Sequence, residues 1–479
     1  MDTFSQAIGS VLDAYNTYVG TYALMFLLLP VGLLFTVWLR GIQVWGLKHS
    51  AQLVMGKFDR PGDHGDVNHF QALCTALSAT VGTGNIAGVA LAIYFGGPGA
   101  VFWLWMTGFL GMATKFAECT LAQKYREIHE DGSVSGGPMY YIEHATKHVL
   151  GPFAKPLAIV FAVGTILCSL GTGNMAQSNS MADAVHAFTL PIGDGFHIPT
   201  WATGLLLAVL VGSVILGGIR RIANVAERLV PFMAFFYVTA AIAVIGFEYD
   251  RVPGMFRLIL EGAFTGTAAT GGFVGSTFIL TARYGIARGL FSNEAGQGSA
   301  PIAHAAARTE YPVREGLVAL MEPMVDTLVI CTMTAIVILL SGAWDDGLMG
   351  AAMTYDAFRI GLDVTVGGVQ LGGAVVSVSL LLFAFTTAIS WSYYGDRAVG
   401  YLFGRKWVTP YRYMYCVFVV IGAVWAQELV WKFVDAVITV MAVPNLVALV
   451  ILSPMVARMT REYFAIDHRP TAPRKAAAL

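Results

Sequence analysis

Charged side chains are scarce in this sequence. Asp, Glu, Lys and Arg together make up 12% of its 479 residues, about half the share of about 25% that is usual in soluble domains. The mean hydropathy is +0.65. Because so few charges cannot cover a water-exposed surface, the composition nearly rules out a water-soluble enzyme. The net charge of −1 also lacks the basic excess that a nucleic-acid partner requires.

Cysteine is equally sparse, and its placement excludes further classes. The five cysteines are scattered in or beside apolar stretches and have no metal-ligand spacing. An odd number also argues against a complete disulfide framework. No signal peptide is predicted, because the first basic residue, Arg40, follows the first apolar run. Residues 1–20 have apolar side chains at helical spacing and are expected to form an amphipathic helix on the membrane surface.

Long uncharged runs are abundant, and a membrane-spanning helix needs about 20 such residues. Residues 70–114 are too long for one crossing and contain the turn sequence Gly-Gly-Pro-Gly from Gly96, so they predict two. Since lipid-exposed backbone must satisfy its own hydrogen bonds, the runs predict an all-α polytopic membrane protein. Eleven spanning helices are expected, near residues 21–40, 70–95, 98–124, 154–180, 200–218, 227–247, 273–305, 314–342, 369–394, 411–427 and 431–457.

Basic residues are distributed unevenly between the two ends of these helices. With the N-terminus outside and the C-terminus in the cytoplasm, 22 of the 29 Lys and Arg residues fall inside, four fall outside and three lie within helices. This bias matches the positive-inside rule. The predicted location is therefore the cell membrane (plasma or inner membrane), with the lipid bilayer as a partner.

Ten helices remain when the first is set aside, five in residues 70–247 and five in residues 273–457. An odd number per half gives the halves inverted topology, which is common in secondary transporters, although any ten helices divide into two fives. The expected organisation is an N-terminal segment with one extra helix and a cytoplasmic loop (1–69), the two five-helix repeats, an extracellular connector (248–272) and a cytoplasmic tail (458–479).

The first helix of each half is interrupted by glycines and polar residues. Residues 78–85 read Ser-Ala-Thr-Val-Gly-Thr-Gly-Asn, and residues 291–299 read Phe-Ser-Asn-Glu-Ala-Gly-Gln-Gly-Ser. Small residues of this kind can simply allow close helix packing. Corresponding interruptions in two halves nevertheless favour a binding site formed by two broken helices.

Broken helices of this composition suit a zwitterion. Freed amides at the start of a half-helix favour an anion, here those of Thr83, Gly84 and Asn85. Freed carbonyls can accept from an ammonium or coordinate Na⁺, here those of Thr80, Phe291 and Ser292.

Glu294 is the formal negative charge of this region. Intramembrane carboxylates are functional candidates by default. The alternative is a structural partnership with Arg288 or Arg308.

A third element lies in residues 383–395, which contain adjacent threonines, Thr386 and Thr387. Such residues often bond back to their own helix. If they face the broken first helix, they supply two hydroxyl oxygens to a sodium ion. Trp391 lies four residues after Thr387 on the same helix face and is expected to wall a small pocket.

Four motifs together resemble one family. They are Gly-Gly-Pro-Gly-Ala-Val-Phe-Trp-Leu-Trp from Gly96, Ser-Ala-Thr-Val-Gly-Thr-Gly-Asn-Ile-Ala-Gly from Ser78, Phe-Ser-Asn-Glu-Ala-Gly-Gln-Gly-Ser-Ala-Pro from Phe291 and Trp-Ser-Tyr-Tyr-Gly from Trp391. The chain resembles the alanine or glycine:cation symporter family roughly from Tyr22 to Arg458. The resemblance implies a LeuT-type 5+5 inverted repeat with one extra N-terminal helix. It also implies import of alanine, glycine or serine with Na⁺ by alternating access.

The resemblance further implies roles for individual residues. The amides of Thr83 and Gly84 would bind the substrate carboxylate, and the carbonyls of Phe291 and Ser292 would bind its amine. The implied substrate site comprises Thr80, Thr83, Gly84, Asn85, Phe291, Ser292, Asn293, Glu294, Gly296 and Trp391. The implied sodium site comprises Ser78, Val81, Phe383, Thr386 and Thr387. Glu294 and Gln297 depart from the wider LeuT-type group, which is less polar there.

Other intramembrane charges have open roles. Lys115 and Glu118 lie three residues apart in one helix and are candidates for an ion pair within the membrane. The alternative is that the Lys115 side chain extends to the cytoplasmic surface. His304 stands isolated near the cytoplasmic end, where a surface or packing role is expected.

Two acidic residues, Glu322 and Asp326, lie one helical turn apart. They are candidates for a cation site, for a gate or for pairing with Arg283 or Arg288. Asp435 is a candidate partner in an extracellular gate.

Sodium-coupled symport has several competing interpretations. A proton-coupled carrier would need a carboxylate such as Glu294 or Asp326 to titrate near neutral pH. An intramembrane enzyme would need a catalytic cluster, yet HExxH and GxSxG are absent, as is the Walker A sequence of ATP-driven pumps. A channel would be expected to show a ring of pore-lining charge, and none is evident. No enzyme activity, organic cofactor or obligate protein partner is predicted, and the expected substrates are small neutral amino acids.

Overall fold

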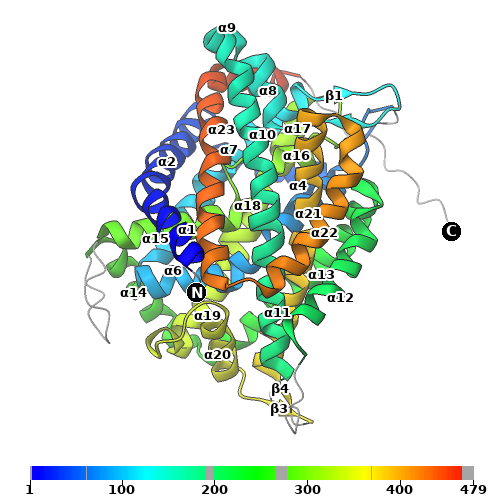
Figure 1. Cartoon of the computed structure of the whole chain (residues 1–479). Coiled ribbons are helices and arrows are strands. Elements are labelled where there is room, and N and C mark those ends of the chain that lie inside the picture. The colour runs from blue at the N-terminus through cyan, green and yellow to red at the C-terminus, as the bar shows by residue number, and fades with distance from the viewer. Residues whose placement is uncertain (1–2, 61, 190–197, 266–277, 368, 467–479) are drawn as a thin grey trace, which may run out of the picture.

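The computed structural model describes residues 3–60, 62–189, 198–265, 278–367 and 369–466. Within these ranges the chain is mostly helical, and its longest helices run side by side through one bundle (Figure 1). Two short antiparallel hairpins lie at opposite ends of the bundle. They pair β1 (Glu127–Ile128) with β2 (Val134–Ser135), and β3 (Thr365–Val366) with β4 (Val369–Gln370). The prediction of an all-α protein is confirmed.

The N-terminal helices pack on the outside of the bundle. Helix α1 runs into α2 through the π-helical turn η1, so Ile8–Trp38 forms one apolar helix. The helix expected over residues 1–20 therefore exists, but it continues directly into the first span. The elements are α1 (Thr3–Tyr15), η1 (Asn16–Gly20), α2 (Thr21–Trp38), α3 (Ile42–Trp45) and α4 (Leu47–Val54).

The first predicted repeat contains a strongly bent span. It begins at a capping box, in which Asn68 Oδ1 accepts from the Gln71 amide at 2.8 Å and the Gln71 side chain accepts from the Asn68 amide at 3.2 Å. The two parts of this span meet at 52°. The elements are α5 (His69–Thr80), η2 (Gly84–Gly88), α6 (Val89–Gly96), α7 (Ala100–Lys124), α8 (Pro138–Ala145), α9 (Lys147–Leu150), η3 (Gly151–Phe153), α10 (Ala154–Leu170), η4 (Gly171–Met175), α11 (Ala176–Thr189), α12 (Thr200–Ile215) and α13 (Gly218–Phe247).

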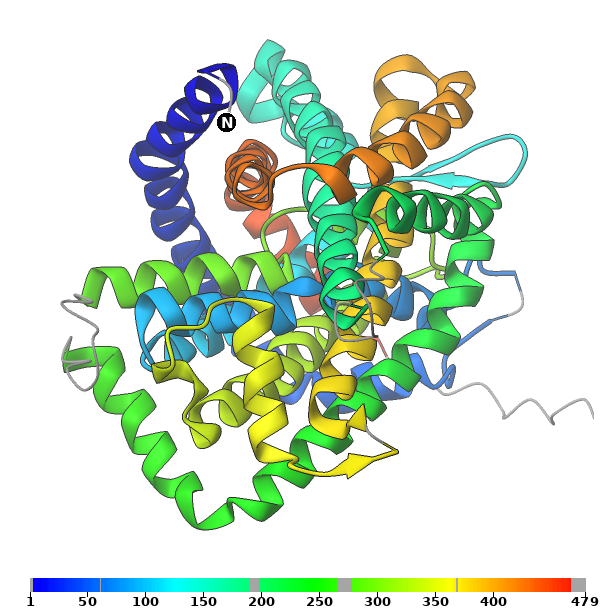
Figure 2. The same ribbon diagram turned by 60° about the horizontal axis from the view of Figure 1, so that its bottom comes forward.

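The remainder of the chain includes the second broken span and a long bundle helix, α23, that contains Pro444 and Pro454. In Figure 2, α13 runs along one edge of the molecule, and α6 and α15 lie side by side. The elements are η5 (Tyr249–Arg251), α14 (Val252–Thr265), α15 (Phe278–Asn293), α16 (Ala300–His304), α17 (Pro312–Ala319), α18 (Met321–Pro323), η6 (Met324–Cys331), α19 (Thr332–Ser341), η7 (Ala343–Asp345), α20 (Ala351–Gly361), α21 (Leu371–Phe403), η8 (Arg405–Trp407), α22 (Val408–Val424) and α23 (Gln427–Phe464).

Seven helices of the described residues are long and apolar enough to cross a membrane, or eight when the bent pair α5 and η2–α6 is taken as one span. The predicted spans in α7, α12 and α15–α16 are not among them. Helix α12 has 16 residues, α7 carries two charged residues in its interior, and α15–α16 is interrupted. The count of eleven and the 5+5 repeat stay predictions.

Several helices were not expected from the sequence, and α14 and α20 are the longest of them. Residues 248–272 were predicted to be a connector, yet α14 occupies part of them. Helix α20 lies between two expected spans. Both are short and amphipathic and carry charges such as Arg257 and Arg359, so a search for uncharged runs misses them. The predicted stretch 266–272 lies outside the described residues.

Glycines allow the bundle helices to approach closely. A Cβ added at Gly316 of α17 would lie 2.1 Å from Thr120 Oγ1 of α7, and one added at Gly173 would lie 2.1 Å from Cβ of Trp391 in α21. Neither position has room for a side chain. These contacts hold α17 against α7 and η4 against α21.

Candidate substrate and sodium site

The first broken span is interrupted between Thr80 and Gly84. Val81 has an extended conformation and ends α5. Asn85 Oδ1 accepts from the Gly82 amide at 2.8 Å, and the Asn85 amide donates to the Gly82 carbonyl at 3.3 Å. The Asn85 side chain therefore stabilises the non-helical turn. The interruption predicted from the glycines is confirmed.

Part of this turn is bound by a residue that sequence reasoning missed. The Thr83 amide donates to Gln177 Oε1 of α11 at 3.3 Å, and Gln177 in turn donates to the Thr172 carbonyl at 3.0 Å. A signal for this region did exist, because Gly-Thr-Gly-Asn occurs at residues 82–85 and again at residues 171–174. The first copy overlaps the start of the π-helical turn η2 and the second lies within the π-helical turn η4, and such turns often occur at functional sites.

The second broken span is non-helical from Glu294 to Ser299. Glu294, Gly296 and Gly298 have φ angles of 56°, 87° and 85°. Glycine adopts such angles readily, whereas a non-glycine residue with positive φ is uncommon and often marks a functional site. The two glycines therefore let the chain leave α15 and enter α16 within six residues.

Glu294 forms hydrogen bonds inside the helical bundle. Neither Arg288 nor Arg308, the two partners considered for it, pairs with it. Its carboxylate accepts from Ser299 Oγ and from Trp391 Nε1, the latter at 2.9 Å. Arg288 instead pairs with Asp435 at 2.8 Å, and Arg308 donates to backbone carbonyls. The alternative of an Arg288 or Arg308 partnership is wrong. Glu294 and Trp391 together connect the second break to α21.

The two broken spans approach each other at Gly84, at the end of the first break, and at Ser292, just before the second break. A Cβ added at Gly84 would lie 3.0 Å from Cδ1 of Phe291 and 3.2 Å from Cα of Ser292. The structure thus brings Gly84, Asn85, Phe291 and Ser292 together. Three other predicted substrate residues are bound elsewhere: Thr80 to its own helix, Asn293 to Thr107 and Ala295, and Gly296 to Asn445.

Asp326 lies where the breaks meet. Its carboxylate accepts from Asn85 Nδ2 at 2.6 Å, from Ser292 Oγ at 2.7 Å and from Thr327 Oγ1 at 2.8 Å. It is fully buried. Burial of a carboxylate is costly unless hydrogen bonds or a cation compensate it, and here donors from both broken spans surround it. Of the two acidic candidates on this helix, Asp326 is therefore the one that joins the site.

Of the predicted sodium ligands, Val81 and Thr387 lie together at the first break, whereas the Thr386 hydroxyl bonds back to its own helix, as threonines in helices often do. Thr387 Oγ1 is 3.3 Å from the Val81 carbonyl, and a Cβ added at Gly82 would lie 2.6 Å from the same hydroxyl. Thr386 Oγ1 donates to the Phe383 carbonyl at 3.0 Å. Ser78 lies one turn before Val81, and its hydroxyl contacts Ser390 of α21. Carbonyl and hydroxyl oxygens from α5 and α21 thus face each other, a donor set that suits Na⁺.

Aromatic rings and an ion pair cover the site on the predicted extracellular side. The rings of Phe291 and Trp431 have centroids 5.1 Å apart, and the Arg288 guanidinium lies 5.6 Å from the Trp431 ring. Arg288 also pairs with Asp435 of α23 at 2.8 Å. This ion pair is consistent with the prediction that Asp435 is a partner in an extracellular gate. The gating role of Asp435 stays a prediction.

The remaining charged residues have partners that the sequence did not indicate. Lys115 pairs with Glu322 at 2.9 Å, and Glu118 accepts from Asn445 at 2.5 Å. The Lys115–Glu118 pair and the extension of Lys115 to the cytoplasm are both wrong, because Lys115 is fully buried among these partners. His304 is also buried between two carboxylates and is neither isolated nor at the surface.

A helical membrane bundle in which two broken spans meet at a buried polar site defines a secondary transporter. The comparison with known families specifies it further. The chain belongs to the sodium:alanine symporter family, whose model matches residues 5–476. This membership confirms the resemblance seen in the sequence motifs, and it makes the protein a multi-pass membrane transporter, not an enzyme.

Several transporters are similar to this chain over nearly their whole length. An uncharacterized transporter of Haemophilus influenzae is 44% identical over 95% of this chain and 96% of its own. The sodium/alanine symporter AgcS of Methanococcus maripaludis is 39% identical over 95% of this chain and 97% of its own. The probable sodium/glutamine symporter GlnT of Bacillus subtilis is 36% identical over 96% of this chain and 91% of its own.

The fold is also similar to a solved structure, that of MhsT in complex with L-phenylalanine. The TM-score is 0.52 at 12% sequence identity, over 84% of this chain and 99% of that one. This likeness supports a LeuT-like fold and carries no further conclusion about the site.

Proposed function

We propose that the protein is a symporter that imports alanine, glycine and serine together with Na⁺ by alternating access. The observation that carries the proposal is the meeting of the two breaks around Asp326, with Asn85 from one span and Ser292 from the other on the same carboxylate. A carboxylate surrounded by hydroxyls and amides can balance an ammonium or a sodium ion. Membership of the sodium:alanine symporter family and the named relatives support the same choice.

In this proposal the substrate carboxylate lies at the amides of Thr83 and Gly84, where the half-helix dipole favours negative charge. Its amine faces Asp326 and the carbonyls of Phe291 and Ser292. Phe291 restricts the volume left for the side chain, because its ring lies against Gly84 on one side and Trp431 on the other. Sodium binds at Thr387, Thr386 and the carbonyls of Ser78, Val81 and Phe383.

The test is uptake of radiolabelled alanine into proteoliposomes. An inward Na⁺ gradient should drive accumulation, and replacement of Na⁺ by choline at constant pH should abolish it. Uptake that persists in choline and follows a proton gradient would instead favour the proton-coupled carrier.

Replacing Thr387 by Val is expected to raise the Na⁺ concentration needed for half-maximal uptake. The change removes the hydroxyl that lies 3.3 Å from the Val81 carbonyl and keeps the side-chain shape. Thr386→Val is expected to act in the same direction. Ser377→Ala on the same helix is the control, since Ser377 bonds only within α21 to the Gly373 carbonyl among the described contacts. Unchanged sodium dependence in both threonine variants would remove these residues from the site.

Replacing Phe291 by Ala is expected to relax selectivity towards larger neutral amino acids. The change opens volume beside Gly84 without altering the backbone amides. Competition of glycine, serine, leucine and glutamine against labelled alanine measures it. Leucine should inhibit alanine uptake weakly in the wild type and strongly in the variant. The control Phe256→Ala, which changes an exposed residue, should keep the wild-type ranking of the competing amino acids. If leucine competes with the wild type as well as glycine does, Phe291 does not limit the pocket.

A further inference from the structure

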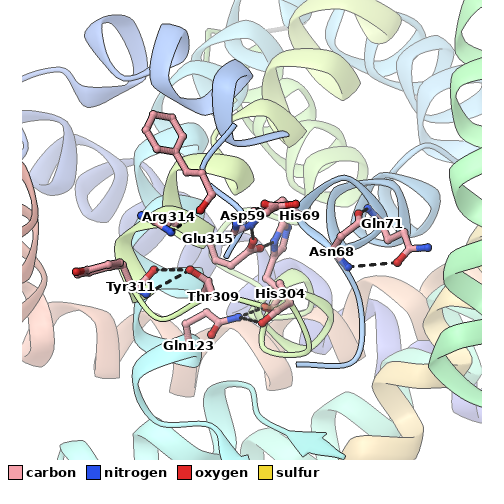
Figure 3. Close-up of polar contacts among 12 residues, drawn as sticks. Asp59, Asn68, His69, Gln71, Gln123, His304, Thr309, Tyr311, Arg314 and Glu315 are labelled. Carbon is pink, nitrogen blue, oxygen red and sulfur yellow. Dashed lines mark hydrogen bonds and ion pairs between the residues drawn. The ribbon is translucent and has the colours of Figure 1, made fainter. Parts of the chain in front are cut away.

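A chain of buried ionisable residues lies outside the substrate and sodium site. Its centre is His304 at the end of α16, with Nδ1 2.5 Å from Glu315 Oε2 and Nε2 2.6 Å from Glu322 Oε1. All three side chains are 0% exposed. Figure 3 shows His304, His69 and Asp59 gathered around Glu315. None of these residues has a role in the transport function proposed above.

The chain extends from His304 in two directions. Towards the interior, Glu322 Oε2 pairs with Lys115 Nζ at 2.9 Å. Towards the predicted cytoplasmic surface, the second oxygen of Glu315 contacts His69 Nδ1, and His69 Nε2 lies 3.8 Å from Asp59 Oδ1. The Asp59 side chain is 50% exposed. The chain therefore runs from a fully buried ammonium to a half-exposed carboxylate, and its last step, from His69 Nε2 to Asp59 Oδ1, is longer than a hydrogen bond.

The arrangement around His304 requires one extra proton. A neutral imidazole carries one N–H and can donate to one carboxylate, so its other nitrogen would face the second carboxylate with a lone pair. With a proton added to the imidazole, both contacts become charge-assisted hydrogen bonds. Lys115 and His304 then balance Glu315 and Glu322. His69 needs no extra proton, because a neutral ring with hydrogen on Nδ1 already serves Glu315.

The surrounding groups do not supply this proton. Arg314 Nη1 donates to the Phe58 carbonyl at 3.0 Å, and the Arg126 guanidinium donates to four backbone carbonyls. Gln123 donates to the His304 backbone carbonyl at 2.5 Å. The other titratable groups nearby include Cys119 of α7, Glu118 bound to Asn445, Tyr394 of α21, and Glu294, which accepts from Ser299 and Trp391.

The chain also joins the same ends of the two broken spans. His69 begins α5, and His304 ends α16. Beside them the two backbones are hydrogen-bonded, with the Asp66 amide donating to Ala306 at 2.8 Å and the Arg308 amide donating to Val67 at 2.8 Å. Opening the predicted cytoplasmic side by separating the two spans must break these contacts.

We propose that His304, Glu315 and Glu322 form a proton-binding site that is reached from the predicted cytoplasmic side and holds that side closed. Loss of the proton leaves a net negative charge and a lone pair facing a carboxylate in a dry interior, which favours separation of the spans. The proton leaves through His69 and Asp59 and returns by the same route. It therefore regulates the cycle and is not carried across the membrane, and the inference does not depend on which amino acid is transported.

Hydrogen–deuterium exchange of the full chain in lipid nanodiscs tests the proposal. The segments to follow are residues 64–68 and 305–309, whose amides form the backbone contacts. After correction for the intrinsic pH dependence of exchange, their exchange should accelerate about tenfold between about pH 6.5 and about pH 9.5, a range that extends above that of a free histidine because a carboxylate faces each nitrogen of the His304 ring. Corrected rates that are equal at both pH values would overturn the proposal.

Two variants have opposite expected effects. In His304→Gln, the carboxamide donates to one carboxylate and turns its oxygen to the other, so exchange should be fast at both pH values. In Glu315→Gln, the new amide donates to a neutral His304 and its oxygen accepts from His69, so exchange should be slow at both. His144→Gln, on a half-exposed histidine of α8, should keep the wild-type pH dependence. Wild-type pH dependence in Glu315→Gln would contradict the assignment even if His304→Gln fails to fold.

Discussion

Asp326→Asn is expected to abolish sodium-driven alanine uptake. The native carboxylate accepts three hydrogen bonds, from Asn85, Ser292 and Thr327. An amide removes the negative charge and presents an N–H₂ group to residues that are themselves donors. Loss of one partner in a buried, hydrogen-bonded charge pair costs about 2–5 kcal/mol, which corresponds to about 30-fold to several thousandfold in affinity.

The loss is measured in proteoliposomes, as the rate of uptake of labelled alanine and as the Na⁺ concentration that gives half-maximal uptake. Asp345→Asn is the matched control, because Asp345 is an exposed carboxylate just after α19 and should leave uptake unchanged. Size-exclusion chromatography separates loss of the site from loss of the fold. A well-folded Asp326→Asn protein that transports at the wild-type rate would exclude Asp326 from both the substrate and the sodium site.

Gly84→Leu is the second change with a large expected effect, and it should also eliminate transport. Even a single Cβ at this position would lie 3.0 Å from the Phe291 ring and 3.2 Å from the Ser292 backbone. A leucine side chain would therefore occupy the place where the two breaks meet and where the substrate carboxylate approaches the amides. Gly84→Ala should have an intermediate effect, because the Phe291 ring can shift by a few tenths of an ångström.

The control for this substitution is Gly246→Leu in α13, where an added Cβ meets no atom within 4 Å. Binding of labelled alanine to purified protein is the more informative assay, since it does not require the complete cycle. The proposed pocket is wrong if Gly84→Leu binds alanine with wild-type affinity.

The positions of the broken spans could be predicted from the sequence because their cause is local. Gly82 and Gly84 weaken a helix, Asn85 bonds to the backbone of its own turn, and Gly296 and Gly298 permit positive φ. The seven helices that are long and apolar enough to cross a membrane were predictable for a similar reason, since each contains a run of apolar residues. Helices α14 and α20 were not, because they are short, charged and amphipathic.

The partners of the charged residues could not be predicted, because they depend on the tertiary fold. Lys115 pairs with a residue 207 positions away instead of with its neighbour three positions away. Asp326 and Asn85 are separated by 241 positions. Glu322 and Asp326 are carboxylates one turn apart, yet they belong to two different clusters, one around His304 and one that joins Asn85 to Ser292.

The most direct test of the proposed site is a cryo-electron microscopy map of the chain in lipid nanodiscs with Na⁺ and L-alanine. The expected result is amino-acid density between the two breaks, with its carboxylate at the amides of Thr83 and Gly84 and its amine facing Asp326. A second density should lie between Val81 and Thr387. Amino-acid density elsewhere, for example in the cavity that Arg283 and Asp435 line, with empty space between the breaks, would contradict the proposed site.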